Sequence, residues 1–584
     1  MSVLNAIRKD LIDAFNDASY NRVSAEVSVS RRPELCDFQC NTALKLTGQY
    51  GKTSLEIAES VAEKLKDRHE LHYDVSVQTP GFINITLTDA WLVNYLNSVL
   101  EDPYLGSEPA INPQKIIVDF GGANVAKALH VGHLRSAVIG ESIIRLLRFK
   151  GHEVIGDIHL GDWGLQMGLV IEMLKSEQPD LPYFQFEKAK AYPNLPPFDI
   201  DKLTELYTNA NIKSKEDQAF RALAAQATAS LQEGHAGYLA LWQHMMNVSV
   251  ADLKKNYGAL QVTFDLWLGE SDSQAAIPFV IKWLEDRKLL VVSEGAKVVF
   301  VDEETDKKPM PPCIFQKSNG AVLYGATDLA TLYQRIEHHH PDEIIYVVDK
   351  RQELHFEQIA RVAYKSEIVP SHTKISFIGF GTMNGHDGKP FKTRDGGVMS
   401  LKDLINTLIQ GAKSRLVDTI EDKDKDDIAL AIGVGALKFG DLSNLPVRDY
   451  VFDLEQFTSF EGKTGPYIQY ALVRIASIKK KINVEESETF PITPPVTDSE
   501  RNLMLKLCMF SAWVDLATSL RQPSKICDYV FELSQTFNHF YHEVHIISEQ
   551  DMIKKMSYYS LLGLTQKVIK QCLWLLGIQE LEKM

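Results

Sequence analysis

The chain has 584 residues, of which 45% are apolar and 24% are charged. This composition excludes a disordered or fibrous protein, and the length is too great for one core, so roughly three or four compact units are expected. The net charge of −15 argues against a protein that coats nucleic acid by bulk electrostatics, but it allows local basic faces such as Arg31-Arg32 and Lys479-Lys480-Lys481.

Neither a membrane protein nor a cysteine framework is predicted. No stretch approaches the run of about 18 apolar residues that crosses a bilayer, and residues 1–15 have the pattern of an amphipathic helix rather than a cleavable signal. The six cysteines are scattered without a C-x-x-C pair, which favours buried thiols over disulfides or a zinc site. We therefore expect a cytoplasmic protein that has no membrane partner and no zinc.

Residues 1–110 are predicted to form a small α+β domain. Helical patterns lie near 2–18 and 52–67, and residues 82–87 alternate as a strand does. The segment 107–115 is a plausible linker to the next domain.

Residues 115–170 have the pattern of a parallel α/β fold. An apolar run at 116–118 is followed by a loop, a helical stretch over 131–149 and a second strand over 153–158, which together fit one βαβ unit. Ligands of such folds bind at the carboxyl ends of the strands. We therefore predict the first half of a Rossmann-type nucleotide-binding domain, with its site in the loop before the helix.

The rest of the chain is predicted to complete this α/β architecture. Apolar strands at 344–348 and 375–380 indicate the second half of the nucleotide fold, and long helical periodicity near the C-terminus indicates an all-α bundle. The expected segments are a helical insertion at 171–270, the second Rossmann half at 271–400, a connecting region at 401–454 and the bundle at 455–584.

Two histidines, His130 and His133, lie at the start of the helix predicted after the first strand. Being three residues apart, they share one helix face, where unpaired N–H groups and the helix dipole attract phosphate. Gly132 lets a ligand approach the backbone, and Lys127 adds a cation. Imidazole N–H groups in this place are suited to donate to phosphate oxygens as charge builds in a transition state.

The H-x-x-H spacing alone is a weak signal. The chain has 17 histidines, so the spacing arises readily by chance, and His539, His542 and His545 repeat it twice near the C-terminus. There we expect ordinary helix packing, with metal binding as the open alternative. The glycine and the preceding strand and loop are what distinguish His130 and His133.

The segment from Asn124 to Ser136 resembles the extended HIGH signature of arginyl-tRNA synthetases, N-x-A-K-x-x-H-V-G-H-L-R-S. Residues 161–166 are similar to the G-D-W-G-x-Q segment of this class I family, and 80–84 resemble its N-terminal domain. Residues 460–471 resemble the opening of its anticodon-binding helical domain, so the resemblance covers nearly the whole chain.

This resemblance implies an arginine–tRNA ligase. Such an enzyme takes ATP with Mg²⁺ as the substrate complex, activates L-arginine to arginyl-adenylate, and transfers arginine to the 3′-terminal adenosine of tRNA(Arg), giving AMP and pyrophosphate. For arginyl enzymes it also implies that tRNA must bind before the adenylate forms, and that the protein is a monomer without a prosthetic group. The N-terminal domain is then expected to bind the D-loop, residues 401–454 to contact the tRNA stem, and the final bundle to bind the anticodon.

The resemblance also assigns individual residues. Positions that match catalytic residues are His130, His133, Lys127, Lys389, Lys392 and Arg394. Positions that match ATP contacts are Ala123, His130, Gly132, His133 and Met383. Positions that match arginine contacts are Asp119, Asn124, Tyr324, Asp328 and Gln352. Positions that match tRNA contacts are Phe38, Gln39, Tyr541 and Met584.

The candidate arginine contacts can be compared with what a guanidinium group requires. A guanidinium is planar and permanently charged, so its site needs carboxylates that pair with it. Asp119 ends a predicted strand, and Tyr324 and Asp328 share one face of a predicted helix. Without the resemblance, Asp119 would be taken for a strand-end cap and Asp328 for a helix-surface acid. No large editing module is evident, as expected where a hydrogen-bonding site rejects near-cognate substrates unaided.

The second phosphate-binding loop of the family, KMSKS, is absent in that spelling. Residues 387–397 stand in its place and carry Lys389, Lys392 and Arg394 between glycines, which suits a loop that closes over a triphosphate. A basic surface hairpin is the alternative. The tRNA assignments have a similar alternative, since these residues taken alone read as core aromatics and a frayed end.

One departure concerns the loop before Asn124. Where the family commonly has Ser, Ser or Ala, then Pro, this chain has Gly121-Gly122-Ala123, so a looser loop is expected. The change also raises the rival hypothesis of an RNA-binding paralogue without catalysis, and a further rival is a related class I synthetase of another amino-acid specificity. The retained histidines and Lys127 disfavour the first, and the paired acids Asp119 and Asp328 disfavour the second.

Overall fold

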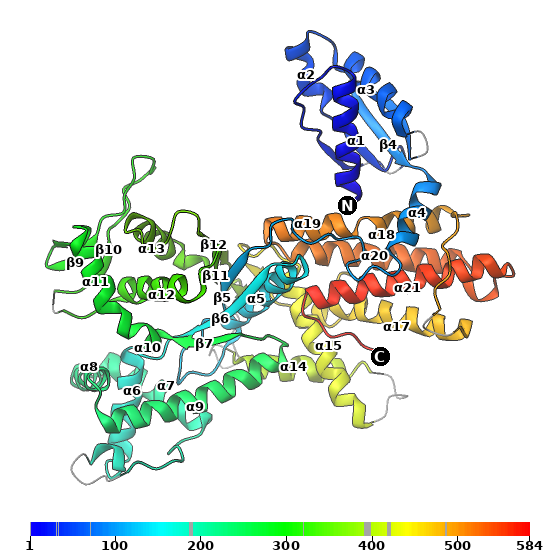
Figure 1. The fold of residues 1–584 in the computed structure, drawn as a ribbon. Helices are drawn as coiled ribbons and strands as arrows, with labels where there is room; N and C mark the ends of the chain where they lie inside the picture. The colour runs from blue at the N-terminus through cyan, green and yellow to red at the C-terminus, as the bar shows by residue number, and fades with distance from the viewer. Residues whose placement is uncertain are drawn as a thin grey trace. The chain divides into compact units, whose positions relative to one another are not determined.

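The computed structural model describes residues 2–30, 32, 34–69, 72–185, 191–318, 320–389, 399–416, 422–484 and 488–584. The chain forms two compact units, each discontinuous in sequence, and Figure 1 colours it from the N-terminus to the C-terminus. The first unit comprises Met1–Ala110, Leu416–Ala431 and Ser459–Met584, and the second comprises Ile111–Arg415 and Ile432–Thr458.

The first unit opens with an α+β layer whose four strands form an antiparallel sheet in the order β1-β2-β4-β3. The elements are α1 (Val3–Asp17), β1 (Val27–Val29), β2 (Phe38–Cys40), α2 (Ala43–Tyr50), α3 (Ser54–His69), β3 (Tyr73–Gln78) and β4 (Phe82–Leu87). α1 buries Val3, Ile7 and Leu11 at a spacing of one helical turn, and α3 contacts both α1 and the sheet. The predicted helices near 2–18 and 52–67 and the strand at 82–87 are confirmed.

The same unit contains the predicted all-α bundle. Its helices are α17 (Gly465–Ile482), α18 (Asp498–Cys508), α19 (Phe510–Leu520), α20 (Ser524–Glu543) and α21 (Met552–Leu575), and α4 (Asp89–Val99) packs on α18. Leu503, Leu533 and Phe537 are fully buried in its core. His539, His542 and His545 are exposed, so the expected packing role of these three histidines is wrong.

The expectation that no stretch is long and apolar enough to cross a membrane needs a correction. Among the described residues, Asp498–Leu520 passes that test by length and composition, with a mean hydropathy of 1.4 in its most apolar window. This stretch consists of two successive bundle helices, α18 and α19, and half of the window is buried inside the protein. Core helices of bundles give the same signal, so it is weak grounds for a membrane span.

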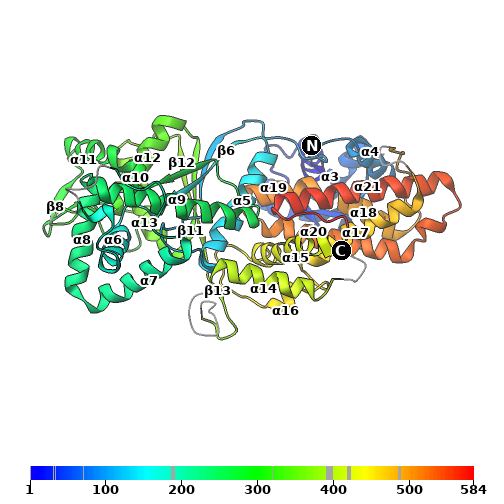
Figure 2. The same cartoon turned by 90° about the horizontal axis from the view of Figure 1, so that it is seen from below.

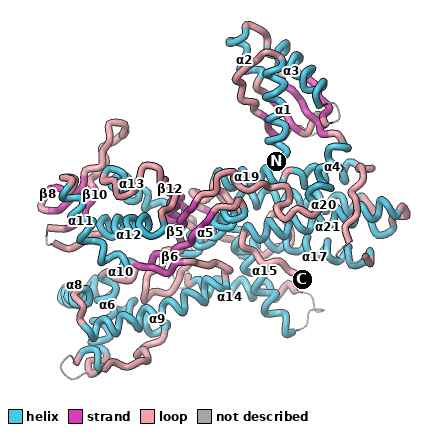
Figure 3. Tube along the Cα trace, in the orientation of Figure 1, coloured by secondary structure: helices cyan, strands magenta, loops and turns pink. Residues whose placement is uncertain are grey.

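Five parallel strands form the central sheet of the second unit, in the order β12-β11-β5-β6-β7. They are β5 (Lys115–Asp119), β6 (Glu153–Leu160), β7 (Leu266–Gly269), β11 (Glu343–Asp349) and β12 (Lys374–Phe380), drawn as magenta segments in Figure 3. β5 pairs with both β6 and β11, so the strand order reverses at β5, as in a Rossmann-type fold. The carboxyl end of β5 therefore lies at the point where such folds bind ligands.

Helices surround this sheet, as predicted for an α/β domain. α5 (Val131–Phe149) joins β5 to β6, and α12 (Tyr324–His339) and α13 (Glu353–Lys365) precede and follow β11. The helical insertion after β6 consists of α6 (Leu165–Glu177), α7 (Ile200–Glu216), α8 (Gln218–Gln232) and α9 (Ala236–Ala259). α6 packs against α7 and α8, which makes the insertion a helical cluster of its own.

Several shorter elements complete the second unit. Between β7 and α12 lie α10 (Glu270–Ser273), α11 (Ile277–Asp286) and an antiparallel sheet of β8 (Val291–Ser293), β9 (Ala296–Val299) and β10 (Cys313–Gln316). After β12 follow β13 (Met383–Asn384), α14 (Leu401–Lys413), α15 (Asp422–Leu442), β14 (Tyr450–Val451) and α16 (Leu454–Phe457). Of these, α15 belongs to the first unit up to Ala431 and to the second from Ile432. Figure 2 shows α14 beside α16, and α14 also contacts α5.

The helix α5 approaches the end of β5 closely at Gly140. A Cβ at this position would overlap the side chain of Phe120, which is fully buried and packs its ring 4.4 Å from that of Phe264. Phe120 directly follows Asp119. Gly140 therefore sets the spacing between the helix that begins at the histidine pair and the strand end that carries Asp119.

Gly140→Ala is expected to lower the thermal unfolding midpoint of the second unit by several degrees, because overpacking a close-packed core costs about 1–3 kcal/mol. Gly258→Ala is the matched control, since Gly258 lies in α9 and a Cβ there meets nothing within 4 Å. Differential scanning calorimetry compares the two variants with the parent chain. Equal midpoints for both variants would show that Phe120 gives way without strain.

Candidate active site

The side chains of the histidine pair cap the start of α5. His130 is the N-cap residue, and its Nδ1 accepts a hydrogen bond from the backbone N–H of Gly132 at 3.0 Å. The Nδ1 of His133 accepts from the backbone N–H of His130 at 3.1 Å, and the two ring centroids lie 3.9 Å apart. Because each Nδ1 is an acceptor, the proton of each neutral ring resides on Nε2. The pair therefore presents two Nε2–H donors.

Burial keeps both imidazoles uncharged. Burial lowers the pKa of His130 to about 4, with a smaller contribution from Lys127, and it lowers the pKa of His133 to about 3, with contributions from His130 and Lys127. Burial also lowers the pKa of the Lys127 ammonium. At neutral pH the histidines thus act as dipolar donors, which leaves the helix end and the cations as the attraction for phosphate.

A steric constraint, besides access for a ligand, explains why position 132 is a glycine. A Cβ on Gly132 would lie 2.8 Å from Cε1 and 2.9 Å from Nδ1 of His130, closer than real side chains approach. Any larger residue would therefore push the His130 ring away from its capping position. The glycine inside the motif and the orientation of the first histidine depend on each other.

The chain that follows the segment predicted to replace KMSKS is attached to the start of α5. The backbone N–H of Val131 donates to the carbonyl of Met399 at 3.2 Å, and Leu401 donates to the carbonyl of Leu129 at 2.9 Å. Lys389 is exposed, and its backbone N–H donates to Asp387 at 3.1 Å. Lys392 and Arg394 lie outside the described residues, so their assignments stay predictions.

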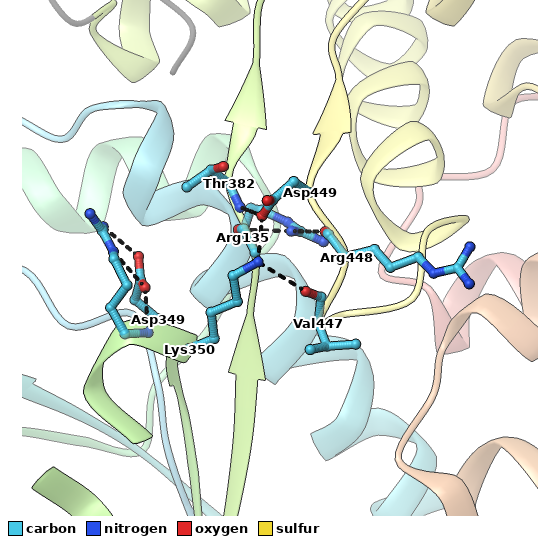
Figure 4. A network of polar contacts seen from close by, with 9 residues as sticks. Arg135, Asp349, Lys350, Thr382, Val447, Arg448 and Asp449 are labelled. Carbon is cyan, nitrogen blue, oxygen red and sulfur yellow. Dashed lines mark hydrogen bonds and ion pairs between the residues drawn. The ribbon is translucent and has the colours of Figure 1, made fainter. Parts of the chain in front are cut away.

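A buried arginine attaches the N-terminal side of the same segment to α5 (Figure 4). Arg135 is 1% exposed, and its Nη1 donates to the carbonyls of Gly381 and Arg448 at 2.8 and 2.9 Å. Its Nε donates to Asp441 at 3.0 Å. Arg135 thus bonds the strand end before Met383 to the helix of the histidine pair, and Met383 itself is buried.

Asp449 and Lys350 extend this network toward the end of β11 (Figure 4). Lys350 Nζ lies 2.8 Å from Asp449 Oδ1, which also accepts from the backbone N–H of Thr382 at 2.8 Å. These two contacts lower the pKa of Asp449, so it is ionised at neutral pH. The turn η3 (Lys350–Gln352) is thereby fixed to the residues that precede β13.

A cavity of about 390 Å³ opens beside the carboxyl ends of the parallel strands. All five predicted arginine contacts line it: Asp119, Asn124, Tyr324, Asp328 and Gln352. They come from the end of β5, the loop before α5, the first turns of α12 and η3. Ala123, a predicted ATP contact, lines it as well, although its own side chain is buried.

The loop that carries Asn124 is bonded on both sides. Gly121 has φ +84, and its backbone is held by Ser136 Oγ, which accepts at 2.8 Å, and by Tyr257 OH, which donates at 2.6 Å. Asn124 forms a parallel bridge to Gly161. Glycine is required at 121 because of its left-handed backbone. The loosening expected from the missing proline stays a prediction.

Carboxylates dominate the polar lining of the cavity. Asp119 pairs with the buried Arg335 at 2.6 Å, and Asp328 contacts Nε2 of His355 at 2.5 Å. A third carboxylate, that of Glu270, stands at the start of α10. Burial raises its pKa to about 7, with further contributions from Asp162 and Asp328. Three carboxylates therefore line the cavity and attract a cation, and Arg335 compensates part of their charge.

Sequence reasoning missed several lining residues. These are His159, Glu270, Thr331, Arg335, Tyr346, Val348, His355 and Phe356, together with the glycines 122 and 161. Glu270 directly follows β7, just as Asp119 ends β5. The carboxyl ends of the parallel strands were the available signal, but β7 was not predicted. Asp162, in the G-D-W-G-x-Q segment, accepts from Ser271 and so fixes the turn that carries Glu270.

The predicted tRNA contacts lie in the first unit. Phe38 is 1% exposed and packs in the core of the α+β layer, so an RNA contact at this place falls to other residues. Its neighbour Gln39 is half-buried and donates to Asn84 at 2.9 Å. Tyr541 on α20 is half-buried and stacks on Phe537, and Met584 at the chain end is half-buried.

Comparison with known proteins assigns the chain. The family described as tRNA synthetases class I (R), catalytic domain, matches residues 96–454. The arginyl tRNA synthetase N terminal domain matches residues 2–87, and the DALR anticodon binding domain matches residues 468–584. The chain belongs to the arginyl-tRNA synthetase family.

Whole proteins align with this synthetase over their full lengths. It is 49% identical to an arginine–tRNA ligase of Alkaliphilus oremlandii, covering 98% of each chain, and 45% identical to one of Agathobacter rectalis, covering 100% of each. The crystal structure of the arginyl-tRNA synthetase of Plasmodium falciparum superposes with a TM-score of 0.81 at 25% identity, covering 99% of each chain. The predicted fold, with a Rossmann-type catalytic domain between an N-terminal domain and a helical bundle, is confirmed.

Both imidazoles of the synthetase are expected to stay uncharged Nε2–H tautomers from about pH 6 to about pH 8, because their folded pKa values lie well below this range. ¹⁵N NMR of histidine-labelled protein checks this, with His130→Asn and His133→Asn assigning the signals. Gly132→Ala should shift the His130 signals, because the added Cβ displaces that ring. A histidine of the pair that takes up a proton within this range would contradict the geometry.

Proposed function

We propose that this arginine–tRNA ligase activates arginine in the cavity at the end of β5, with ATP seated at the start of α5. The observation that carries the proposal is the convergence of five residues, from four segments of the chain, on one cavity of about 390 Å³. Asn124 and Ala123, in the loop before α5, belong to its lining, whereas His130 and His133 do not. The arginine carboxylate attacks the α-phosphate of ATP, pyrophosphate leaves, and arginyl-adenylate forms. The arginyl group then passes to the terminal 2′-hydroxyl of tRNA(Arg).

The side-chain end of arginine is proposed to contact the carboxylates of the cavity. Asp119 and Asp328 are placed to pair with the guanidinium, because charge-assisted bonds to a planar cation are strong and directional. Tyr324, which is 62% exposed, stands at the mouth of the cavity on the same helix as Asp328. Asn124 and Gln352 supply amide groups for the other end of the amino acid.

The phosphates of ATP are proposed to lie against α5. The Nε2–H groups of His130 and His133 donate to phosphate oxygens, and the backbone at Gly132 and the Lys127 ammonium add attraction for the anion. ATP enters as its Mg²⁺ complex. Lys389, Lys392 and Arg394 are proposed to stabilise the leaving pyrophosphate, and Ala123 and Met383 to contact the nucleotide. Catalysis then rests on positioning and electrostatics, without a covalent enzyme nucleophile.

The protein is proposed to act as a monomer in the cytoplasm. Its first unit is proposed to bind tRNA. Its N-terminal domain presents Gln39 toward the D-loop, and its bundle presents Tyr541 and Met584 toward the anticodon. Half-buried aromatic side chains suit stacking on unpaired bases. We also propose that tRNA must be bound before arginyl-adenylate forms.

ATP–pyrophosphate exchange tests the reaction and its substrate together. We expect exchange with arginine alone among the amino acids, and only when tRNA is present. Asp328→Asn should raise the KM for arginine on the order of 10²-fold while the KM for ATP stays within about twofold, because a buried charge pair is lost at the guanidinium end only. Asp286→Asn, on the exposed end of α11, is the control. An unchanged KM for arginine in Asp328→Asn would rule out this cavity.

Arginine binding is expected to depend on pH through Glu270. The folded pKa of about 7 lies above the ordinary 4.5, so the stability that this proton confers is complete below about pH 4.5 and is lost as the pH rises through about 7. A bound guanidinium favours the ionised form, so arginine should bind more tightly, and release a proton, as the pH rises from about 6 to about 8.

Calorimetric titration of arginine near pH 7, in two buffers of different ionisation enthalpy, measures this proton release. Glu270→Gln should abolish the buffer dependence and flatten the pH profile of arginine affinity. It should also raise the unfolding temperature at high pH, where the buried carboxylate of the parent chain is ionised. Proton release that persists in Glu270→Gln would place the titrating group elsewhere.

A further inference from the structure

A guanidinium that belongs to the protein itself stands in the wall of the proposed arginine cavity. Arg335 lies on α12, seven residues after Asp328, and is 3% exposed. Its Nη2 lies 2.6 Å from Asp119 Oδ2 and 2.6 Å from Asp157 Oδ2, and its Nη1 donates to Tyr346 OH at 3.2 Å. One cation thus bridges two carboxylates, and one of these carboxylates lines the cavity.

Strand pairing forces these two carboxylates together. Asp119 and Asp157 are direct register partners on the parallel strands β5 and β6. Both are buried, and two neighbouring carboxylates in a low dielectric cannot both remain ionised without a compensating charge. Arg335 supplies that charge. The formal charges of Asp119, Asp157 and Arg335 add to one net negative charge, which matches one monovalent cation.

The three groups differ in what they expose. The side chain of Asp119 retains 11% exposure, whereas those of Arg335 and Asp157 retain 3% and 0%. Asp157 does not reach the cavity lining, and Asp119 does. The part of the Asp119 carboxylate that Arg335 leaves unpaired is therefore the part of this cluster available to a ligand in the cavity.

We propose that Arg335 is a positioning residue for substrate arginine: by pairing with Asp119 and Asp157 together, it keeps Asp119 ionised and turns its free oxygen toward the cavity. This inference rests on the proposed function of the cavity. It makes selectivity for a cation depend on the balance of the whole cluster rather than on Asp119 alone. Either a lost cation or a lost anion upsets this balance, and losing both restores it.

The dependence on charge balance is tested with two single variants and their combination. In Arg335→Met the two carboxylates share a proton, so the one negative charge is divided between Asp119 and Asp157, and only Asp119 lines the cavity. Asp157→Asn leaves Asp119 fully neutralised by Arg335. Each single variant is expected to raise the KM for arginine at least about tenfold, with the KM for ATP within about twofold of the parent. The double variant restores one net negative charge, so its KM for arginine should return to within about threefold of the parent value.

The pH profile provides a second measurement. In Arg335→Met the KM for arginine should fall as the pH rises, because the shared proton leaves the two carboxylates. In the double variant that added dependence should be absent. Both measurements use ATP–pyrophosphate exchange with saturating tRNA, and circular dichroism confirms the fold of each variant.

The outcomes separate this inference from the function on which it rests. Rescue in the double variant supports the positioning role, whereas a merely structural ion pair predicts that the two losses add, and additive losses overturn the inference. If Asp328→Asn raises the KM for arginine but Asp157→Asn does not, the inference is wrong and the cavity assignment stands. If neither variant affects it, the cavity assignment itself fails. Should Arg335→Met not fold, Asp157→Asn alone and combined with Arg335→Gln carries the same comparison.

Discussion

The arrangement of side chains at the carboxyl edge of the parallel sheet depends on the balance between buried positive and negative charges. Asp119 and Asp157 are held side by side by strand pairing, and Arg335 neutralises one of the two charges. A second buried pair, Arg135 with Asp441, lies under the start of α5. Removing one partner of such a pair is expensive, because the other charge is left in a low dielectric. The positions of the cavity and of the start of α5 therefore depend on charged groups that are almost entirely buried.

The apolar pattern of the sequence was sufficient to predict elements that are long and well buried. The helix α5 and the strands β4, β5, β6, β11 and β12 follow from apolar spacing, and Tyr324 and Asp328 share the face of α12 that their i and i+4 spacing predicts. Short elements such as β7 and β8 lack room for a pattern to develop, since β7 has four residues and only Gly269 is buried. Glu270 was missed for that reason, because its place is defined by a strand that the sequence does not announce.

Other site features depend on tertiary contacts that no local pattern encodes. Arg335 and His355 are ordinary helix residues in sequence, and only the packing of α12 and α13 brings them to Asp119 and Asp328. For the H-x-x-H motif, the sequence predicted how the two side chains lie relative to each other but not their hydrogen bonds. Its spacing predicted a shared face, but only the structure shows that both Nδ1 atoms accept backbone hydrogen bonds at the start of the helix, which fixes the tautomer of each ring. The same residues serve the fold and the proposed chemistry.

The double attachment of the KMSKS-like segment has a consequence for the entropy of the loop. Arg135 bonds to Gly381 before the segment, and Leu129 and Val131 bond to the backbone at Met399–Leu401 after it. The described residues on both sides of 390–398 are therefore held to one helix, which fixes where this stretch of the chain begins and ends. The dependence on loop length is logarithmic, so doubling the segment would change the closure free energy by only about 0.6 kcal/mol. The same two attachments can therefore serve loops of different length and spelling, because the closure free energy hardly depends on the number of residues between them.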